Sequence, residues 1–493
     1  MEFERHILSK STYMMGQQCS KRLWLYKHRP DLKREISVSQ QKVFETGTNV
    51  GLIAKKLFPN GQDATPIDHF HYPKAILGTQ KWIKEGAAHI YEPTFQYDKV
   101  LAALDILVKR ENKWYAYEVK SSTEIKDYFL VDAALQYYVI TNAGLPIEDI
   151  YIIHINTEYE RRGDIDIKSL FKIVSVKQEV LSLQQGIPSF INQCKAVINQ
   201  LHEPKLDIGP HCNTPYECEF KDHCWKHIPD VSIFDLSRLR TEKKFELYSR
   251  GVVELHQIPT DFQLTDAQQL QVKSYRENYE HFDRNKIQEW LRQLKYPLCF
   301  MDFETFMPAI PLYDNSRPYQ QIPFQFSLHI QSEPNGELRH FEFLGSPEID
   351  PRSDFLSQLL NAIDGNGSIL VYNKTFETSR LQELKDLFPD STEQVDQVLN
   401  RIVDLMEPFR QKWVYNSKMN GSYSIKQVLP ALVDEINYTN LEIGEGGAAM
   451  AAFEKLLNVI DIEERERIRK SLLDYCKVDT LGMVKILEKL YVL

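Results

Sequence analysis

Three side chains in the first quarter of the sequence have the types and spacing that metal-dependent phosphodiester hydrolysis needs. Asp105 belongs to an apolar run, and Glu118 and Lys120 lie in the next strand-like segment, Tyr115–Lys120. Side chains alternate along a strand, so Glu118 and Lys120 point to one face. Carboxylates hold divalent cations, and a lysine can position the attacking water or offset charge at the scissile phosphate.

A second set of acids, together with a tyrosine, occurs in the C-terminal half. Asp302 and Glu304 end an apolar strand and share one of its faces. Tyr475 and Asp479 are in i and i+4 positions of a predicted helix, so they share a face as well. With Glu377, which follows a strand at the start of a helix, these acids can hold two divalent ions across a phosphodiester and orient a water for in-line attack.

The elements around the first set of residues predict a mixed sheet. Strand-like runs at 100–107 and 115–120 are followed by a helical pattern at about 127–142 and an apolar strand at 150–155. This order of strand, strand, helix and strand is typical of an α/β domain. Before it, a capped helix with a large aromatic face is predicted over about residues 8–26.

The pattern changes along the 493 residues, and the length alone favours more than one domain. Residues 1–228 are predicted to form the first α/β domain. Charged helical sequence with few strand signals occupies 229–295, which we interpret as a connector. A new apolar strand at 298–304 opens a second α/β domain, 296–493, in which strands are followed by mainly helical sequence.

The composition is that of an ordered protein with a formal net charge of −10. This charge argues against a protein that coats nucleic acid non-specifically, but it leaves room for a local basic groove. No apolar run reaches the roughly 20 residues that span a bilayer. The N-terminus lacks the pattern of a signal peptide. We therefore expect a cytoplasmic protein without a membrane partner.

Four of the seven cysteines are candidate metal ligands. An odd number argues against a simple disulfide scaffold. Cys212, Cys218 and Cys224 form a compact group, to which Cys19 can be added, and such thiol density in a cytoplasmic protein indicates a metal. Zinc fits four thiolates, and a cubane iron–sulfur cluster fits the same ligand count. Three histidines are possible substitute ligands for zinc: His211, His223 and His227.

The first domain resembles the iron–sulfur RecB-like nucleases, in which one cysteine precedes a restriction-endonuclease-like core and three follow it. In that family the core carries an Asp, then Glu/Asp-x-Lys, then a helix with a Gln. Asp105, the Glu118-Val-Lys120 tripeptide and Gln136 match in order. The resemblance implies a mixed-sheet nuclease domain whose ends are stapled together by a 4Fe–4S cluster on the four cysteines.

This first domain departs from the family pattern in two places. Five residues separate Cys212 from Cys218, where the family commonly has two. Many relatives carry a metal-binding His on the early helix, and the matching stretch Glu45–Gly51 has none. Either Glu92 or water then completes the metal coordination, or this nuclease site is weakened.

The second domain resembles the RNase H-like exonucleases of the DnaQ/DEDD group, in the variant where a tyrosine precedes the last Asp. The Asp302-Phe-Glu304 tripeptide matches the first motif, Asn373-x-x-Phe-Glu377 the second and Tyr475-x3-Asp479 the third. The second motif normally ends in Asp, so Glu377 is a departure, and Asp404 is the candidate that compensates. The resemblance implies bound Mg²⁺ or Mn²⁺ and a tyrosine that places the attacking water.

The whole chain is similar to a bacterial family in which a RecB-like iron–sulfur region precedes an exonuclease-like domain. Four segments carry that similarity: Met301–Thr305, Ile322–Phe326, Tyr372–Phe376 and Gly421–Lys426. We expect a metal-dependent DNA nuclease that acts on single-stranded DNA or DNA ends in repair or defence. The alternatives are a nucleic-acid-binding scaffold or end-sensor with weakened sites, and a zinc-stabilised RNA-processing enzyme.

Overall fold

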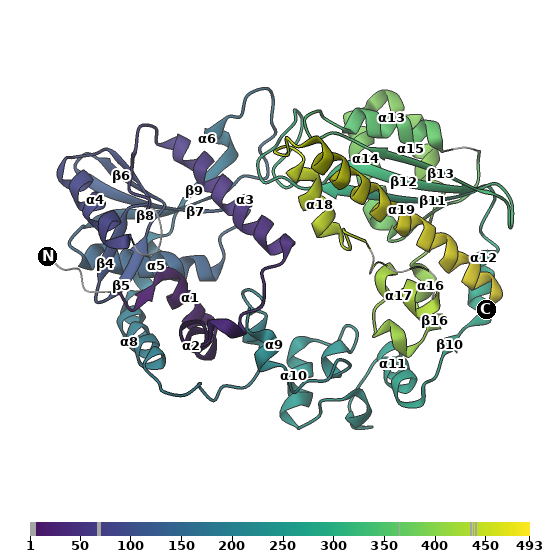
Figure 1. Ribbon diagram of the computed structural model, residues 1–493, viewed down its shortest axis with the longest axis horizontal. Coiled ribbons are helices and arrows are strands. Elements are labelled where there is room, and N and C mark those ends of the chain that lie inside the picture. The colour runs from purple at the N-terminus through teal and green to yellow at the C-terminus, as the bar shows by residue number, and fades with distance from the viewer. Residues whose placement is uncertain (1–5, 67–70, 364, 434–435, 437, 439–440) are drawn as a thin grey trace. The chain divides into compact units, whose positions relative to one another are not determined.

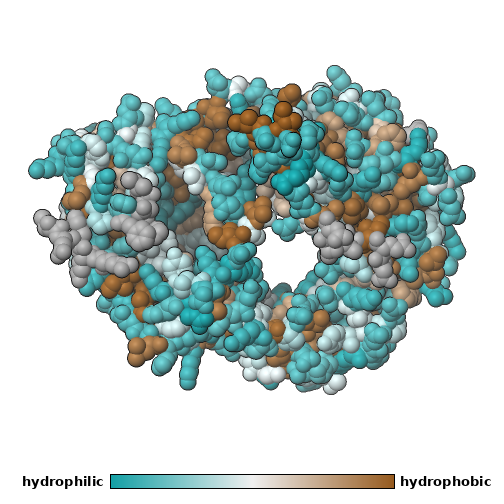
Figure 2. All heavy atoms as spheres, viewed as in Figure 1, coloured by the Kyte–Doolittle hydropathy of each residue, from teal (hydrophilic) through white to brown (hydrophobic). Residues whose placement is uncertain are grey.

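The computed structural model describes residues 6–66, 71–363, 365–433, 436, 438 and 441–493 (Figure 1). The chain divides into two compact units: unit 1 comprises Met1–His227 with Ala309–Tyr319, and unit 2 comprises Ile228–Pro308 with Gln320–Leu493. Both units contain helices and a mixed sheet, which confirms the predicted mixed α/β fold. Figure 2 shows hydrophobic side chains interspersed among hydrophilic ones on the visible surface. Within the described ranges, no helix combines the length and the apolar character that crossing a membrane requires.

Unit 1 is built on a six-stranded sheet in the order β2-β3-β6-β7-β8-β9. These strands are β2 (Gln62–Asp63), β3 (His89–Tyr91), β6 (Ile106–Arg110), β7 (Lys113–Lys120), β8 (Ile147–Ile155) and β9 (Phe171–Ser175). β7 pairs antiparallel with β6 and parallel with β8. Glu111 and Asn112 join β6 to β7, and both have positive φ angles, which suits the two-residue turn of a twisted hairpin.

A smaller sheet of unit 1 has the order β1-β5-β4. Its strands are β1 (Leu8–Ser9), β4 (Thr94–Tyr97) and β5 (Val100–Ala103). The strand predicted over 100–107 is therefore two strands. β5 pairs with β1 and β4, whereas β6 pairs with β3 and β7, so the chain changes sheets between them. Asp105 lies at this break.

The helices of unit 1 pack against these two sheets. They are α1 (Lys10–Gln18), α2 (Ser20–His28), α3 (Val38–Ala54), α4 (Tyr72–Lys84), α5 (Asp127–Asn142), α6 (Ile167–Leu170), α7 (Lys177–Leu183), α8 (Ile187–Ile198) and α9 (Lys221–Cys224). The helix predicted near the N-terminus begins with a capping box formed by Ser9 and Thr12. It is interrupted at Cys19, whose extended backbone ends α1 and caps α2.

Unit 2 contains a five-stranded sheet in the order β13-β12-β11-β14-β15. These strands are β11 (Leu298–Phe306), β12 (Ile322–Gln331), β13 (Leu338–Leu344), β14 (Ile369–Val371) and β15 (Ile402–Asp404). β11, β12 and β13 are antiparallel neighbours, while β14 is parallel to β11 and to β15. Almost every residue of β11 and β12 is buried, which requires cover on both faces of the sheet.

Helices provide this cover in unit 2. They are α13 (Arg352–Ala362), α14 (Lys374–Leu387), α15 (Thr392–Leu399), α16 (Glu407–Arg410), α17 (Ile425–Leu432), α18 (Gly446–Lys455) and α19 (Ile462–Val492). α19 lies across β11 and β12 (Figure 1). Because side chains alternate, Phe300 packs in the core that includes α19, and Phe303 packs with α13 on the opposite face.

The segment interpreted as a connector, 229–295, groups with unit 2. It contains α10 (Thr241–Ser249), α11 (Asp266–Glu277) and α12 (Arg284–Leu291). The short strand β10 (His281–Phe282) pairs with β16 (Val414–Tyr415), and α12 places Ile287 and Trp290 in the core that includes α19. This segment is therefore integrated into unit 2 by packing.

Candidate functional site

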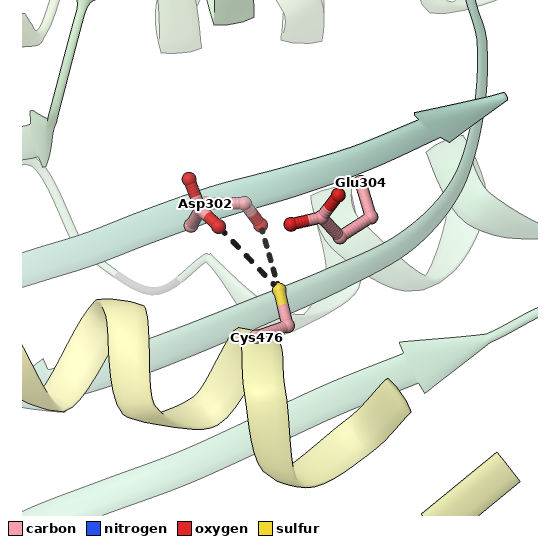
Figure 3. Close-up of side chains that lie close together, drawn as sticks. All are labelled: Asp302, Glu304 and Cys476. Carbon is pink, nitrogen blue, oxygen red and sulfur yellow. Dashed lines mark hydrogen bonds between the residues drawn. The ribbon is translucent and has the colours of Figure 1, made fainter. Parts of the chain in front are cut away.

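Asp302 and Glu304 of β11 point to the face of the unit 2 sheet that α19 covers (Figure 3). The residue between them, Phe303, packs in the core on the other face. Asp302 is half-buried, and Glu304 is only 8% exposed. The alternation of a single strand thus delivers two adjacent carboxylates beneath a helix.

α19 brings the third motif to the same place. Tyr475 and Asp479 lie one turn apart on this helix, and both line the same cavity as Asp302 and Glu304. The hydroxyl of Tyr438 donates a hydrogen bond to Oδ1 of Asp479, at 2.5 Å. Cys476 also faces the strand, and its thiol donates to Oδ2 of Asp302 over a sulfur–oxygen distance of 3.6 Å (Figure 3).

The predicted acids Asp302, Glu304 and Asp479 meet at one cavity of about 160 Å³ in unit 2. It is lined by Asp302, Glu304, Tyr372, Ile425, Lys426, Tyr475, Asp479 and Met483. The Sγ atom of Cys476 and one carboxylate oxygen each from Asp302 and Glu304 lie within 4.8 Å of one another. Residues far apart in sequence therefore converge on a volume large enough for a hydrated ion.

The electrostatics of this cavity favour a cation. Burial, and then the charge of Asp479, raise the pKa of Asp302 well above its usual value. Burial and the neighbouring acids do the same for Glu304. Burial raises the pKa of Asp479 only to about 6, because the hydrogen bond from Tyr438 and the charge of Lys426 oppose it. A hard divalent cation among these oxygens would relieve the repulsion, so the donor set fits Mg²⁺ or Mn²⁺.

The two remaining predicted acids of unit 2, Glu377 and Asp404, lie in different surroundings. Glu377, in the first turn of α14, is 1% exposed, and its Oε2 has no hydrogen-bond partner. Burial, and then the charge of Asp302, raise the pKa of Glu377 well above its usual value, although Glu377 does not line the cavity. Asp404 accepts two backbone hydrogen bonds and pairs with Arg410 at 3.2 Å. It lines a separate groove of about 590 Å³.

Three residues near this cavity were not assigned a role from the sequence: Lys426, Tyr438 and Cys476. The Nζ atom of Lys426 lies 5.1 Å from the ring centroid of Tyr475 and donates to a backbone carbonyl. In the sequence, Lys426 is the last residue of Gly421–Lys426, one of the four segments that carry the family similarity, and this position could have identified it. Cys476 could have been found from its place beside Tyr475, because both fall on the helix face that carries Asp479. Tyr438 carries no local signal of this kind.

In unit 1, Glu118 and Lys120 of β7 form part of a buried charged group. The Nζ atom of Lys120 lies 2.8 Å from Oε1 of Glu118. Two residues that the sequence did not single out complete the group. Lys10 places its Nζ 2.8 Å from the same oxygen, and Asp132 accepts a hydrogen bond from Lys120 at 2.6 Å. Asp105 accepts a hydrogen bond from a backbone N–H of β7 at 2.6 Å.

Gln136 and Glu92 border the same group. Gln136 is fully buried and donates to Oδ1 of Asp132, one turn earlier on α5, at 3.2 Å. Glu92 pairs with Lys55 at 3.0 Å, although its charge also contributes to the raised pKa of Asp105. Asp132 precedes Gln136 by one helical turn, which is the signal that could have identified it from the sequence.

The titration of the unit 1 group reflects its two lysines. Burial favours the neutral form of Glu118, but Lys10 and Lys120 outweigh burial and hold its pKa below the usual value. Burial, followed by the charge of Glu118, raises the pKa of Asp105 to about 8. Without a bound cation, Glu118 is therefore ionised and paired at neutral pH, whereas Asp105 is mostly protonated.

The four cysteines predicted to bind a metal line one small cavity of unit 1, with a volume of about 20 Å³. Cys19 reaches it from the break between α1 and α2, and the other three reach it from the segment that includes α9. Gln18 links the two segments through hydrogen bonds of 2.7 Å to two backbone carbonyls within 211–216. Burial raises the pKa of Cys218 to about 12 and that of Cys224 to about 11, so these thiols are protonated without a metal.

The three histidines considered as substitute ligands occupy different surroundings. His211 lines the cysteine cavity, as the cysteines do. His223 does not line it and instead pairs with Glu203, at 3.1 Å. His227 is also outside the lining residues. The cavity thus offers four thiols and one imidazole as candidate ligands.

Comparisons with known proteins identify relatives of this chain. A family model described as a domain of unknown function, DUF2779, matches residues 299–424, which include Asp302, Glu304 and Glu377 but end before α19. An uncharacterized protein of Mycoplasma genitalium is 28% identical over 221 residues, and one of Mycoplasma pneumoniae is 26% identical over 223 residues. Each match covers 41% of this chain and 33% of the relative, so the chain spans about a third of the length of these proteins. An uncharacterized protein of Ureaplasma parvum is 26% identical over 471 residues, covering 84% of this chain and 67% of that protein.

Proposed function

We propose that this protein is a divalent-metal-dependent nuclease that hydrolyses phosphodiester bonds in DNA, with its principal active site in unit 2. The observation that carries the proposal is the convergence of Asp302, Glu304 and Asp479 on one cavity, beside Tyr475. These residues are the ones that resemble the DEDD exonucleases, and the mixed sheet beneath α19 supports them rigidly. The raised pKa values of three neighbouring acids are typical of a functional site.

The side chains of this site have separate roles in the proposed reaction. Asp302, Glu304 and Asp479 would hold Mg²⁺ or Mn²⁺, and Glu377, buried nearby, would add negative charge when it is ionised. When bound, the cation supplies Lewis acidity toward the phosphoryl oxygens and lowers the pKa of water. Tyr438 holds the carboxylate of Asp479 through its hydrogen bond, and Tyr475 lines the cavity, where its hydroxyl can position the attacking water.

For unit 1 we propose a second nuclease-type centre of RecB-like character at Asp105, Glu118 and Lys120. One observation favours a second candidate, in which this centre binds nucleic acid without cutting it. Lys10 and Lys120 already neutralise Glu118 in the absence of a metal. A carboxylate with two lysine partners has less to gain from a divalent cation than one without a partner. Unit 1 would then act as a scaffold or a sensor of DNA ends.

We propose that the cysteine cavity holds a 4Fe–4S cluster, with zinc as the alternative. Its four thiols come from both ends of the first 227 residues and surround one cavity, and that donor set fits either group. When bound, the group would join α1 and α2 to the segment around α9. Anaerobic purification with iron, sulfide and zinc analysis distinguishes the two: stoichiometric iron and sulfide support the cluster, and a colourless zinc protein contradicts it.

Cleavage of end-labelled single- and double-stranded DNA, and of matched RNA, tests the proposed function. With Mn²⁺ or Mg²⁺ we expect cleavage of single-stranded DNA or of DNA ends that is lost in Asp302→Asn. Asp354→Asn, an exposed substitution on α13, is the matched control and should cleave normally. Asp105→Asn is tested separately and measures how much the unit 1 centre contributes to cleavage. Metal-dependent cleavage that survives Asp302→Asn would contradict the unit 2 assignment, and binding without cleavage of any substrate would favour the scaffold.

A further inference from the structure

The thiol of Cys476 is an additional donor at the acids of unit 2. Its Sγ atom and the ligand oxygens of Asp302 and Glu304 lie within 4.8 Å of one another (Figure 3). Cys476 is fully buried, and its sulfur is 3.6 Å from Oδ2 of Asp302. A cation held by the two carboxylates would therefore have a sulfur ligand within reach as well as oxygen.

Glu304 indicates independently that this place suits a cation. It is 8% exposed and lines the cavity, and its carboxylate makes no hydrogen bond or ion pair with another described residue. A buried carboxylate without a hydrogen-bond partner is unfavourable, and the repulsion from Asp302 and Asp479 is only partly offset by the charge of Lys426. The side chain is thus aimed at a position where a positive charge is needed.

We propose that Cys476 is a third ligand at this position, and that the mixed thiol and carboxylate set binds thiophilic divalent cations, chiefly Zn²⁺, more tightly than Mg²⁺. The inference rests on the proposed function in that Asp302 and Glu304 are also assigned to the catalytic cation. On binding, the S–H bond of Cys476 breaks, a Zn–S bond forms, and the proton leaves to solvent. Zinc accepts thiolate and carboxylate ligands together, whereas Mg²⁺ takes oxygen ligands. Zn²⁺ therefore displaces the catalytic cation and inhibits cleavage.

The test compares the wild-type full chain with Cys476→Ser and Cys299→Ala. Cys299 is equally buried in β11, but it packs in the core on the opposite face of the sheet, so it controls for the loss of a buried thiol. Each protein is titrated with Co²⁺, and the sulfur-to-cobalt charge-transfer absorbance is recorded. The four cysteines of unit 1 contribute equally to all three proteins and cancel in the difference spectra. Calorimetry then gives the affinities for Zn²⁺ and Mg²⁺.

We expect Cys476→Ser to lose one increment of cobalt–sulfur absorbance and to bind Zn²⁺ at least about tenfold more weakly, with unchanged binding of Mg²⁺. Cys299→Ala should match the wild type. Equal absorbance and equal Zn²⁺ affinity in Cys476→Ser and the wild type would overturn the inference. If Cys476→Ser does not fold, cadmium-113 NMR of the wild type decides, because a second site with one sulfur ligand supports the inference and an oxygen-only site overturns it. These readouts need no cleavage, so a chain without nuclease activity would contradict the proposed function alone.

Discussion

The ammonium of Lys10 lies 2.8 Å from Oε1 of Glu118, across 108 residues of sequence. The same oxygen accepts a hydrogen bond from Lys120 at 2.8 Å. Glu118 is 2% exposed, so two lysines share the charge of one buried carboxylate. Glu304 in unit 2 has no such partner among the described residues. The two candidate sites therefore differ in how much they need a bound cation.

Replacing Lys10 with Met should lower the free energy of unfolding of the chain by about 1–3 kcal/mol, because the buried Glu118 loses one of its two charged partners. Urea unfolding measures the change. Lys113→Met is the matched control: Lys113 is exposed on the same strand as Glu118 and pairs with Glu148 at 3.1 Å, so its loss should cost under about 1 kcal/mol. Equal stability of Lys10→Met and the wild type would contradict the assigned role.

Asp105→Asn should make the stability of the metal-free chain less dependent on pH. The pKa of Asp105 rises from 3.8 to about 8 on folding, mainly through burial. Between these values the folded state holds more protons than the unfolded state, so the free energy of unfolding falls as the pH rises. Asparagine does not titrate, so the variant lacks this decrease in the free energy of unfolding. Its stability relative to the wild type should therefore increase from pH 5 to pH 8. Denaturant unfolding at both pH values measures it, and a difference that stays constant with pH would contradict the raised pKa.

Glu304→Gln should raise the melting temperature of the metal-free chain at neutral pH, because the raised pKa of Glu304 means that the wild type must take up a proton or bury a charge in order to fold. An increase of about 1 kcal/mol in the free energy of unfolding corresponds to a melting temperature roughly 2–4 °C higher for a domain of this size. The same variant should lose the stabilisation that Mn²⁺ gives to the wild type. Thermal unfolding with and without Mn²⁺ measures both effects. Glu289→Gln, an exposed change on α12, should behave as the wild type, and a Mn²⁺ response that persists in Glu304→Gln would contradict the assignment.

Tyr438→Phe should move the acid limb of metal-dependent cleavage to higher pH. The pKa of Asp479 is about 6, raised by burial and restrained by the hydrogen bond from Tyr438. Cation binding needs the ionised carboxylate, so activity rises as the pH passes through this pKa. Loss of the donor should raise the pKa by about one unit. The pH profile of cleavage measures the shift. Tyr491→Phe, an exposed change on the helix that carries Asp479, is the control, and identical profiles for Tyr438→Phe and the wild type would contradict the prediction.

Cys218→Ala should release most of the metal or cluster bound at the cysteine cavity and lower the melting temperature of the chain. The physical reason is that binding energy at a site made by two distant segments is also folding energy. Elemental analysis and thermal unfolding provide the readouts. Cys194→Ala is the control, because Cys194 is buried in the core of unit 1 and does not line the cavity. Equal metal content in the two variants would exclude Cys218 as a ligand.

Local periodicity accounts for part of the candidate sites. The alternation of β11 places Asp302 and Glu304 on one face, and the helical spacing of α19 does the same for Tyr475 and Asp479. These are short-range relationships that backbone geometry dictates once an element forms. The mixed α/β fold follows from the same patterns, because alternating runs of strands and helices must pack as layers.

Two interruptions of the elements were not visible in the sequence. The apolar run 100–107 reads as one strand, yet it divides at Asp105 because its two halves pair with different sheets. The N-terminal helical pattern is continuous, yet it breaks at Cys19, where the thiol turns toward the cavity that it shares with residues near 212–224. In both places tertiary pairing overrides local propensity.

The sequence by itself determined which residue types are available for chemistry, which of them share a strand or helix face, and the mixed α/β class. The tertiary structure decided which of them meet. It brought Lys10 to Glu118 and Asp132 to Lys120, placed Lys426 and Cys476 at the unit 2 acids, and left Asp404 in a separate groove. The physical reason is that burial and charge pairing depend on strand order and on the packing of distant helices, which a periodicity of two or 3.6 residues does not encode.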